Sequence, residues 1–271
     1  MKLHRLILHL FFLLGALVMV FPFLWMLDTS VKTFAESMQT PPKLLPEQWQ
    51  WGNYADVFEQ TNYIRYYLNT LFVTLVKTGG QLLLCSLAAF AFATMTFPGK
   101  RSLFILILSK MMIPQQIILI PTFVLMKHLG WLDTYYALIV PGLASAFGIF
   151  LLRQFFLSLP KELGEAAQID GSSYFRIYWE MYLPLSRPGL TALAIFVILA
   201  SWNDFMWPLI FTSSDGMRVL SLAVASFVGE FSTEYPLMMA AACMAIAPLI
   251  LLFTLFQRYF VAGIALSGMK S

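Results

Sequence analysis

Apolar residues follow one another along this chain in long continuous stretches rather than in an alternating pattern. A helix needs about 20 apolar residues to cross roughly 30 Å of hydrocarbon at about 1.5 Å per residue. Six stretches meet this requirement, namely residues 6–27, 68–97, 103–125, 134–157, 190–211 and 236–260. Continuous runs favour helices over barrel strands, which alternate. The pattern predicts an all-α integral membrane protein with six transmembrane helices.

The composition agrees with a chain that folds largely in lipid. Of its 271 residues, 59% are hydrophobic and 11% charged, whereas about a half and about a quarter are usual in soluble domains. This excludes an ordinary cytosolic enzyme and a secreted disulfide scaffold. A net charge of +3 without a basic cluster argues against a nucleic-acid binder. Cys85 and Cys243 lie in separate apolar stretches, so we expect neither a disulfide nor a metal site.

The basic residues predict the orientation of the spans. With a cytoplasmic N-terminus, ten of them fall in inner segments and five in outer segments. The inner ones are Lys2, Arg5, Lys100, Arg101, Arg153, Lys161, Arg176, Arg187, Arg258 and Lys270, and the outer ones are Lys32, Lys43, Arg65, Lys127 and Arg218. This distribution matches the positive-inside rule. We therefore expect both termini in the cytoplasm, an outer loop over residues 28–67, a cytoplasmic loop over 158–187, and one membrane domain over 1–271.

Two lysines lie inside apolar stretches, where a charge is costly. Lys77 has a long aliphatic stem that could carry its charge to the membrane surface, which we take as its simplest interpretation. Lys110 precedes Pro114, where a kink could expose it to a cavity. The roles of Lys77, Lys110 and the C-terminal tail 261–271 stay open.

The cytoplasmic loop carries the signals of a short helix followed by a tight turn. Pro160 suits a first helical turn, and Leu163, Ala166 and Ala167 share one helical face. Gly171 is suited to the left-handed conformation that ends many helices.

A second short helix should follow the turn. Ser172 or Ser173 can cap it, and Pro184 should close it. Its apolar positions are Ile177, Tyr178, Met181 and Tyr182. Large apolar groups in a cytoplasmic segment need cover, and the residues alone do not decide between the membrane interface, the chain's own spans and another protein.

The segment EAAQIDG, which begins at Glu165, resembles the EAA loop of ATP-binding-cassette (ABC) importer permeases. Glu165, Ala166, Ala167 and Gly171 match that motif, and Leu183 with Pro184 matches its downstream end. Further segments resemble the carbohydrate branch, which is similar to the maltose-transporter inner subunit. They are residues 113–114, 120–121, 129–130, 153–156, 169–171, 202–204, 207–209 and 257–260.

The resemblance implies a type I ABC importer permease, with a coupling helix between spans four and five that contacts an ATPase. The residues implied in that contact are Glu165, Ala166, Ala167, Asp170, Gly171, Tyr174, Leu183 and Pro184. The implied partners are a second permease subunit, two ABC ATPase subunits and an extracytoplasmic solute-binding protein, in a bacterial inner membrane. The ATPases would bind ATP and Mg²⁺ and drive alternating access, while this chain binds no cofactor. The implied solute is a sugar or sugar-like molecule, with a glycerol phosphate or a polyol as the alternative.

The chain itself lacks the motifs of a catalytic subunit. Gly99 and Lys100 are followed by Arg101 rather than by the Ser or Thr of a P-loop. No GxSxG motif is present, and we predict neither catalytic residues nor a metal site. A membrane-embedded enzyme is disfavoured because no span holds clustered His, Cys or paired carboxylates. An ion-coupled secondary transporter, using Asp204 or Lys110, remains an alternative that has no need of an EAA loop.

Polar residues in the fifth span are candidates for the translocation pathway. Asn203 and Asp204 could bond sugar hydroxyls while Trp202 and Trp207 stack on the ring. The alternative, which we favour, is an interfacial aromatic belt with Asp204 paired to a neighbouring loop.

Overall fold

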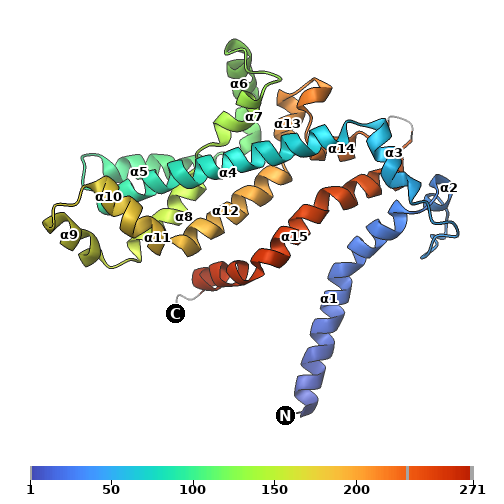
Figure 1. Ribbon diagram of the computed structural model, residues 1–271, viewed down its shortest axis with the longest axis horizontal. Helices are drawn as coiled ribbons and strands as arrows, with labels where there is room; N and C mark the ends of the chain where they lie inside the picture. Colours follow the sequence, from blue (N-terminus) through green and yellow to red (C-terminus); the bar gives the residue numbers. More distant parts are fainter. Residues whose placement is uncertain (1, 230–231, 269–271) are drawn as a thin grey trace. The chain divides into compact units, whose positions relative to one another are not determined.

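The protein is built almost entirely of helices. The structure, a computed structural model, describes residues 2–229 and 232–268 (Figure 1). Lys270 and the end of the predicted tail, residues 269–271, lie outside the described residues. Four helices are long and apolar enough to cross a membrane, namely Ile7–Ser30, Tyr63–Thr94, Tyr135–Leu157 and Tyr235–Leu255, and two bent pairs raise the number to six if each pair is one span. Each of the six predicted stretches overlaps one of these helical regions, but the second bent pair, Tyr174–Leu185 with Arg187–Trp202, overlaps the predicted stretch 190–211 only over residues 190–202.

The chain divides into two compact units. Unit 1 comprises Met1–Tyr67 and Val219–Ile250, and unit 2 comprises Leu68–Arg218 and Leu251–Ser271. The boundaries fall inside two long helices, α4 (Tyr63–Thr94) and α15 (Tyr235–Gly268). A single membrane domain over residues 1–271 stays a prediction.

Unit 1 contains the first span and the predicted outer loop. Its remaining helices are α1 (Lys2–Ser30), α2 (Phe34–Ser37), α3 (Gly52–Gln60) and α14 (Leu220–Ala225). The hydroxyl groups of Tyr54 and Ser30 hydrogen-bond at 2.8 Å, and the Tyr63 hydroxyl donates to the Ala241 carbonyl at 2.7 Å. Residues 28–67 are therefore a folded segment that is bonded to the end of α1.

Unit 2 contains the middle spans and the predicted cytoplasmic loop. Its α-helices are α5 (Lys100–Ser109), α6 (Gln115–His128), α7 (Tyr135–Ile139), α8 (Ala146–Leu157), α9 (Lys161–Ile169), α10 (Tyr174–Ile177), α11 (Leu183–Leu185), α12 (Arg187–Trp202) and α13 (Met206–Phe211). Short 3-10 turns lie at Lys110–Met112, Val140–Gly142 and Asp215–Met217, and a π-helix spans Tyr178–Tyr182. One apolar cluster from α4, α8, α10, the π-helix and α12 forms the core.

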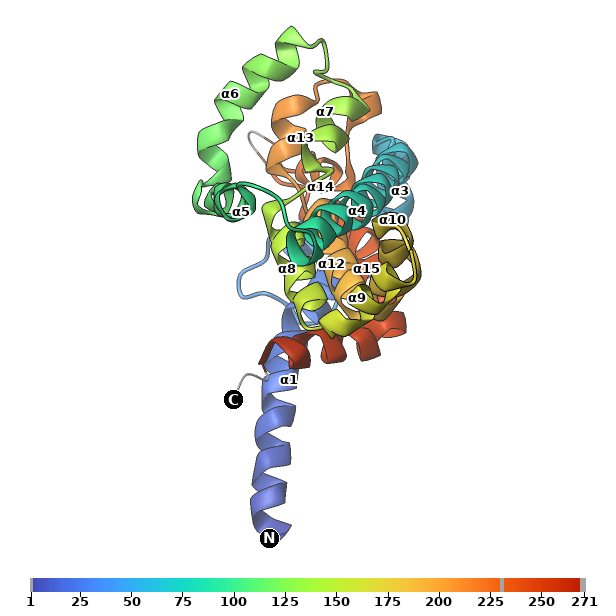
Figure 2. The ribbon, with the colours of Figure 1, turned by 90° about the vertical axis from the view of Figure 1, so that its left-hand side faces the viewer.

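Three of the predicted spans are interrupted as α-helices. The third, predicted over residues 103–125, consists of α5 and α6 at an angle of 101° (Figure 2). The break lies at Pro114, which has no N–H and keeps the residue before it extended. The fourth, over 134–157, is interrupted at Val140–Gly142, and α8 restarts where the Ser145 hydroxyl accepts the Gly148 N–H at 3.0 Å.

The predicted fifth span, over residues 190–211, is not one continuous helix either. Helix α12 ends at Trp202 and α13 begins at Met206. The Asn203 side chain donates back to the Leu199 carbonyl at 2.8 Å, and an Asp204 oxygen accepts the Trp207 N–H at 3.2 Å. Short polar side chains that bond the backbone in this way compete with helix continuation.

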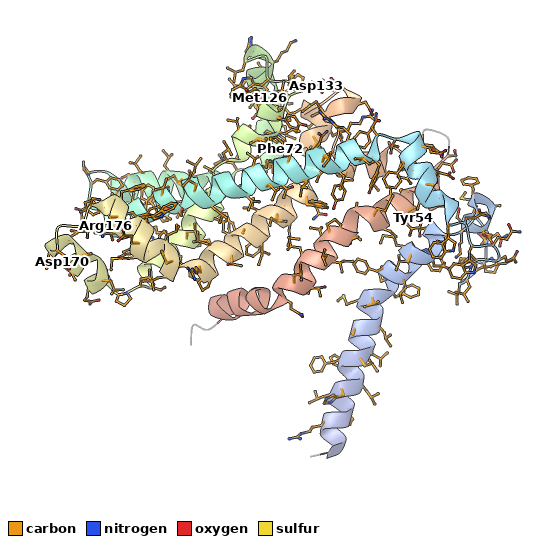
Figure 3. All side chains as sticks on the ribbon, viewed as in Figure 1. Tyr54, Phe72, Met126, Asp133, Asp170 and Arg176 are labelled. Atoms are coloured by element: carbon orange, nitrogen blue, oxygen red, sulfur yellow. The ribbon has the colours of Figure 1, made fainter. Side chains whose placement is uncertain are left out.

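Asp133 joins two loops of unit 2 (Figure 3). Its backbone lies in the left-handed region at φ 58°, and its N–H donates to the Phe211 carbonyl at 2.9 Å. One carboxylate oxygen accepts the N–H groups of Ser213 and Ser214, both at 2.9 Å. Burial acts to raise the pKa of Asp133, but these two N–H groups outweigh it and hold the pKa below 3.8. The carboxylate thus fastens the loop after α6 to the loop after α13.

Candidate functional site: the segment between spans four and five

Helix α9 ends in the tight turn that the sequence predicts. Gly171 has φ +80°, which favours glycine. The Gly171 N–H donates to the Gln168 carbonyl at 3.0 Å, and the Ser172 N–H donates to the Ala167 carbonyl at 2.9 Å. This pair of bonds is the Schellman motif, which satisfies the last carbonyls of a helix. The prediction for Gly171 is confirmed.

The face by which α9 packs differs from the predicted one. Gly164 is buried and Ala167 packs on the core, whereas Leu163 and Ala166 are exposed. A Cβ at position 164 would lie 3.2 Å from the Tyr182 hydroxyl oxygen. The apolar face predicted from Leu163 is therefore wrong, because a glycine allows closer packing than a leucine on that side of the helix.

The second helix begins as predicted and ends one residue later than predicted. The Ser173 hydroxyl accepts the Arg176 N–H at 3.3 Å and caps α10. The helix continues through the π-helix Tyr178–Tyr182 into α11, where Pro184 occupies the first turn. Pro184 therefore does not close it. The bend of 77° comes after Leu185, before α12.

The chain's own spans cover one side of this second helix. The hydroxyl groups of Tyr178 and Ser86, a residue of α4, hydrogen-bond at 2.7 Å. The Phe90 ring lies 5.4 Å from the Tyr178 ring and 5.1 Å from the Tyr182 ring. In α8, the Phe156 ring lies 5.8 Å from that of Tyr182. These contacts tie the segment to two spans. On this side, therefore, the chain's own spans cover the aromatic residues of the segment.

The other side of the segment presents apolar residues to its surroundings. Four apolar residues of the segment, Ile169, Tyr174, Phe175 and Trp179, are exposed, with Ile169 86% and Phe175 68% exposed, and we call these four residues the exposed apolar face. The rings of Phe175 and Trp179 stack at 6.3 Å. Exposed apolar groups clustered among polar residues are typical of a surface that binds another protein.

The residues that the sequence implies in coupling are divided between these two sides. Glu165, Ala166, Asp170, Gly171, Tyr174 and Pro184 are exposed, whereas Ala167 and Leu183 are half-buried against the core. Figure 3 shows Asp170 and Arg176 at the α9–α10 end of unit 2. The contribution of each of these residues to coupling stays a prediction.

The break in the fifth span brings together an ion pair that the sequence analysis missed. The Lys77 ammonium nitrogen of α4 lies 3.7 Å from an Asp204 carboxylate oxygen, and both side chains are mostly buried. The stem of Lys77 lies against Gly142, where a Cβ would be 2.7 Å from the lysine Cε. Lys77 thus finds its counter-charge within unit 2. Asp204 therefore has a partner in a span, where the belt interpretation expects one in a neighbouring loop, and the belt interpretation itself stays a prediction.

The two tryptophans beside the break are packed within the chain. Trp202 and Trp207 are both buried. The Trp207 ring N–H donates to the Ala137 carbonyl at 2.9 Å, and the ring stacks on Phe211 at 4.3 Å. The structure therefore does not support stacking of a sugar on Trp207. A pathway role for Asn203 and Asp204 stays a prediction.

Helix α4 carries further polar contacts that the sequence analysis missed. The Asn69 amide donates to the carbonyls of Gly216 and Arg218, at 2.9 and 2.7 Å. Gln81 donates to the Gly142 carbonyl at 2.8 Å and accepts the Ser145 hydroxyl at 2.7 Å. The sequence did hold a signal for this packing. Thr70, Thr74 and Thr78 recur every four positions inside an apolar stretch, and these buried threonines mark the face by which α4 packs.

Comparison with known proteins identifies the family. A family profile described as "Binding-protein-dependent transport system inner membrane component" matches residues 3–266. The chain belongs to this family. The permease is 35% identical over 258 residues to the arabinooligosaccharides transport system permease protein AraQ of Halalkalibacterium halodurans, covering 94% of this chain and 92% of that protein. It is 32% identical to the sn-glycerol-3-phosphate transport system permease protein UgpE of Pectobacterium atrosepticum, covering 94% of each.

A solved structure shares the fold. The permease superposes with a TM-score of 0.84 on a chain of a bacterial ABC transporter involved in the import of the acidic polysaccharide alginate, at 23% identity, covering 96% of this chain and 97% of that one. The predicted ABC importer permease fold is confirmed. The permease is a multi-pass membrane subunit of an ABC importer, and subunits of this family are not themselves enzymes. Family membership favours this function over an ion-coupled secondary transporter.

Proposed function

We propose that the permease imports a sugar or sugar-like solute by alternating access, driven by ATPase subunits that bind its segment 158–187. The observation that carries the proposal is the two-sided structure of this segment. One side is fastened to α4 and α8 through Tyr178 and Tyr182. The other side leaves Ile169 and Phe175 exposed. A rigid element with one free apolar face can receive a movement and pass it to the spans.

The ATPase contact combines apolar and charged groups. The exposed apolar face docks in a groove of the ATPase, while Glu165 and Asp170 offer charge-assisted contacts to its N–H or basic groups. Glu165 and Asp170 are both exposed and therefore available. ATP and Mg²⁺ bind to the ATPases, not to this chain.

The assembly contains a second permease subunit, two ABC ATPase subunits and an extracytoplasmic solute-binding protein. The family's description as a binding-protein-dependent transport system supports the last of these. The excess of basic residues in the inner segments supports cytoplasmic termini in a bacterial inner membrane. Residues 28–67 then lie on the outer side.

A sugar is the solute that the relatives favour most, because AraQ, at 35% identity, is named for arabinooligosaccharides. A glycerol phosphate is the second candidate because UgpE, at 32% identity, is named for sn-glycerol-3-phosphate. The Lys77–Asp204 pair favours a neutral solute, since the lysine charge is already balanced by a carboxylate 3.7 Å away.

The test of coupling uses the assembled transporter in proteoliposomes. The double variant Ile169→Ser/Phe175→Ser should lower ATPase co-purification and binding-protein-stimulated ATP hydrolysis at least tenfold, because it removes the apolar docking groups. Phe34→Ser, at an exposed residue of α2, is the matched control and should leave both unchanged. Full ATPase recovery with the double variant would contradict the proposal.

The solute is tested on the same proteoliposomes. Uptake of radiolabelled arabinotriose, maltotriose and glycerol 3-phosphate is compared in the presence of the cognate binding protein. Uptake of a sugar supports the proposal, and uptake of glycerol 3-phosphate alone favours the second candidate.

A further inference from the structure

Three basic side chains of unit 2 form a cluster where α4 ends and where α5 and α9 begin. They are Lys100 of α5, Arg153 of α8 and Lys161 of α9, and we call them the basic cluster. The three helix ends lie at one end of unit 2 (Figure 1). The positive charges of Arg153 and Lys161 both act on the Lys100 ammonium group and repel it. Like charges that are gathered in this way favour the binding of an anion.

Two of the three charged groups are held in place by the end of α4. The Arg153 Nε donates to the Phe92 carbonyl at 3.0 Å, and the guanidinium carbon lies 4.2 Å from the centre of the Phe104 ring. The Lys100 ammonium group donates to the Met95 carbonyl at 2.6 Å. Lys100 and Phe104 are four residues apart on α5 and therefore share one face of that helix. These contacts bring the two charges to the same corner of the fold.

The end of α4 balances only part of this charge. A helix C-terminus carries about −0.5 of an elementary charge, against three positive charges in the basic cluster. Arginine has five N–H donors and lysine three, and Arg153 and Lys100 each use one of them here. Among the residues that the structure describes, no carboxylate forms an ion pair with a member of the cluster. The cluster therefore keeps surplus positive charge and unused donors.

The positions of the two lysines add to this surplus. Lys100 is the first residue of α5, and Lys161 is the first residue of α9. The N-terminus of a helix is its positive end, where a cation is unfavourable and an anion is favoured. Helix α9 has Glu162 in its first turn, but α5 has no acidic residue there. An external anion would relieve the repulsion.

The surface of α5 indicates which anion fits. No residue of α5 is buried, and Leu103, Ile105 and Leu106 are 47, 56 and 67% exposed. The basic cluster thus adjoins a helix with apolar side chains open to its surroundings. A phospholipid matches both parts, because its phosphate can bind the cations while its acyl chains pack along the helix. A free phosphate or a protein carboxylate matches only the first part.

We propose that the basic cluster binds the phosphate group of an anionic phospholipid whose acyl chains lie along α5. The Arg153 guanidinium group offers a planar fork of N–H donors to two phosphate oxygens, and Lys100 and Lys161 add point charges. The inference rests on the proposed function in one respect, because the orientation proposed there places this end of unit 2 at the inner leaflet.

The test titrates the delipidated, assembled transporter with phosphatidylglycerol or phosphatidylcholine and measures bound lipid by native mass spectrometry. The wild type should bind phosphatidylglycerol at least about tenfold more tightly than phosphatidylcholine. Lys161→Gln should lower this preference about fivefold. It should not disturb the fold, because the Lys161 side chain is exposed and has no bonded partner among the described residues. Arg153→Lys keeps the charge but loses the fork, so it should lower the preference as well.

Arg101→Gln is the matched control. Arg101 is an exposed neighbour of Lys100, and its charge is not among those that act on Lys100. This variant should bind both lipids as the wild type does. Equal losses in Arg101→Gln and Lys161→Gln would indicate diffuse attraction and overturn the site. Displacement of phosphatidylglycerol by millimolar inorganic phosphate would overturn a lipid as the ligand, and so would a zero-length cross-link from Lys161 to an ATPase carboxylate.

Recovery of the ATPase subunits separates failure of this site from failure of the proposed function. If they co-purify with the wild type, and phosphatidylglycerol shows no preference over phosphatidylcholine, the lipid site alone is overturned. If they bind equally well to the Ile169→Ser/Phe175→Ser variant, and the lipid preference still depends on Lys161, the proposed docking fails and the lipid site stands.

Discussion

Residues 28–67 of unit 1 and residues 158–187 of unit 2, named the outer and the inner segment after the proposed orientation, are held by different forces. In the outer segment, buried Lys32 bonds Asp28 and the Lys43 carbonyl, and the Asn53 amide donates to the carbonyls of Ser30 and Lys32, both at 2.9 Å. The inner segment is held by aromatic packing of Tyr178 and Tyr182 on α4 and α8, while its ion pair Arg176–Glu180 is exposed.

This difference in the forces predicts which substitutions each segment tolerates. Directional bonds to buried charges fix one geometry, and they fail when one partner is removed. Apolar packing depends on volume and buried area instead. Charge substitutions should therefore disturb the outer segment and spare the inner one, whereas loss of volume should disturb the inner segment.

The largest expected effect comes from Lys32→Met in the outer segment. It leaves Asp28 buried without its cation, which should cost about 3–5 kcal/mol of unfolding free energy. Denaturant unfolding in detergent and limited proteolysis within residues 28–67 would measure it. Lys43→Met breaks only the exposed Lys43–Glu47 pair and should change stability by less than about 1 kcal/mol. Equal effects of the two variants would contradict the comparison.

In the inner segment, removing a ring should matter more than removing a hydroxyl. Tyr178→Ala should cost about 3–4 kcal/mol through lost packing on Phe90. Tyr178→Phe should cost only about 1 kcal/mol, because Ser86 also bonds the Leu82 carbonyl. The same unfolding assay compares the two. A Tyr178→Phe variant as unstable as Tyr178→Ala would show that a directional bond holds this segment too.

Acidification should loosen the outer segment through Glu36. The N–H groups of Thr33 and Glu47 bond its carboxylate and hold its pKa below the ordinary value of 4.5. Because the folded-state pKa is the lower one, this contribution is complete above pH 4.5 and is lost as the pH falls through the folded-state value. Hydrogen exchange of residues 33–48 should rise in that range. Glu36→Gln should exchange faster at neutral pH and lose this part of the pH dependence.

The smallest effect is expected from the exposed pair of the inner segment. Arg176→Ala should cost about 0.3–0.5 kcal/mol, as is usual for exposed pairs four residues apart on a helix. Unfolding at low and high salt checks this, because the small difference should vanish at high salt. A loss above about 1.5 kcal/mol would show that charge also holds the inner segment.

Local signals in the sequence predicted the fold well where neighbours along the chain decide the outcome. Hydropathy located the six helical regions, and the left-handed Gly171 and the Ser173 cap follow from residue type and spacing. The EAA resemblance located the segment that the structure shows to be two-sided.

Contacts between distant residues could not be predicted in this way. The Lys77–Asp204 pair depends on the break after Trp202, where side-chain bonds to the backbone overcome an apolar pattern that favours a continuous helix. The face of α9 was mistaken because Gly164 packs against Tyr182, a contact that hydrophobicity does not reveal. Lys32 and Asp28 are four residues apart, but their burial depends on the whole outer segment.

The central claim is that the exposed apolar face of the inner segment docks on an ATPase. The most direct measurement places a photo-cross-linking amino acid at position 169, the most exposed residue of that face, in the assembled transporter, with position 49 of the outer segment as the control. The account predicts a cross-link from position 169 to the ATPase subunit and none from position 49. Absence of any ATPase cross-link from position 169, with the complex intact, would contradict it.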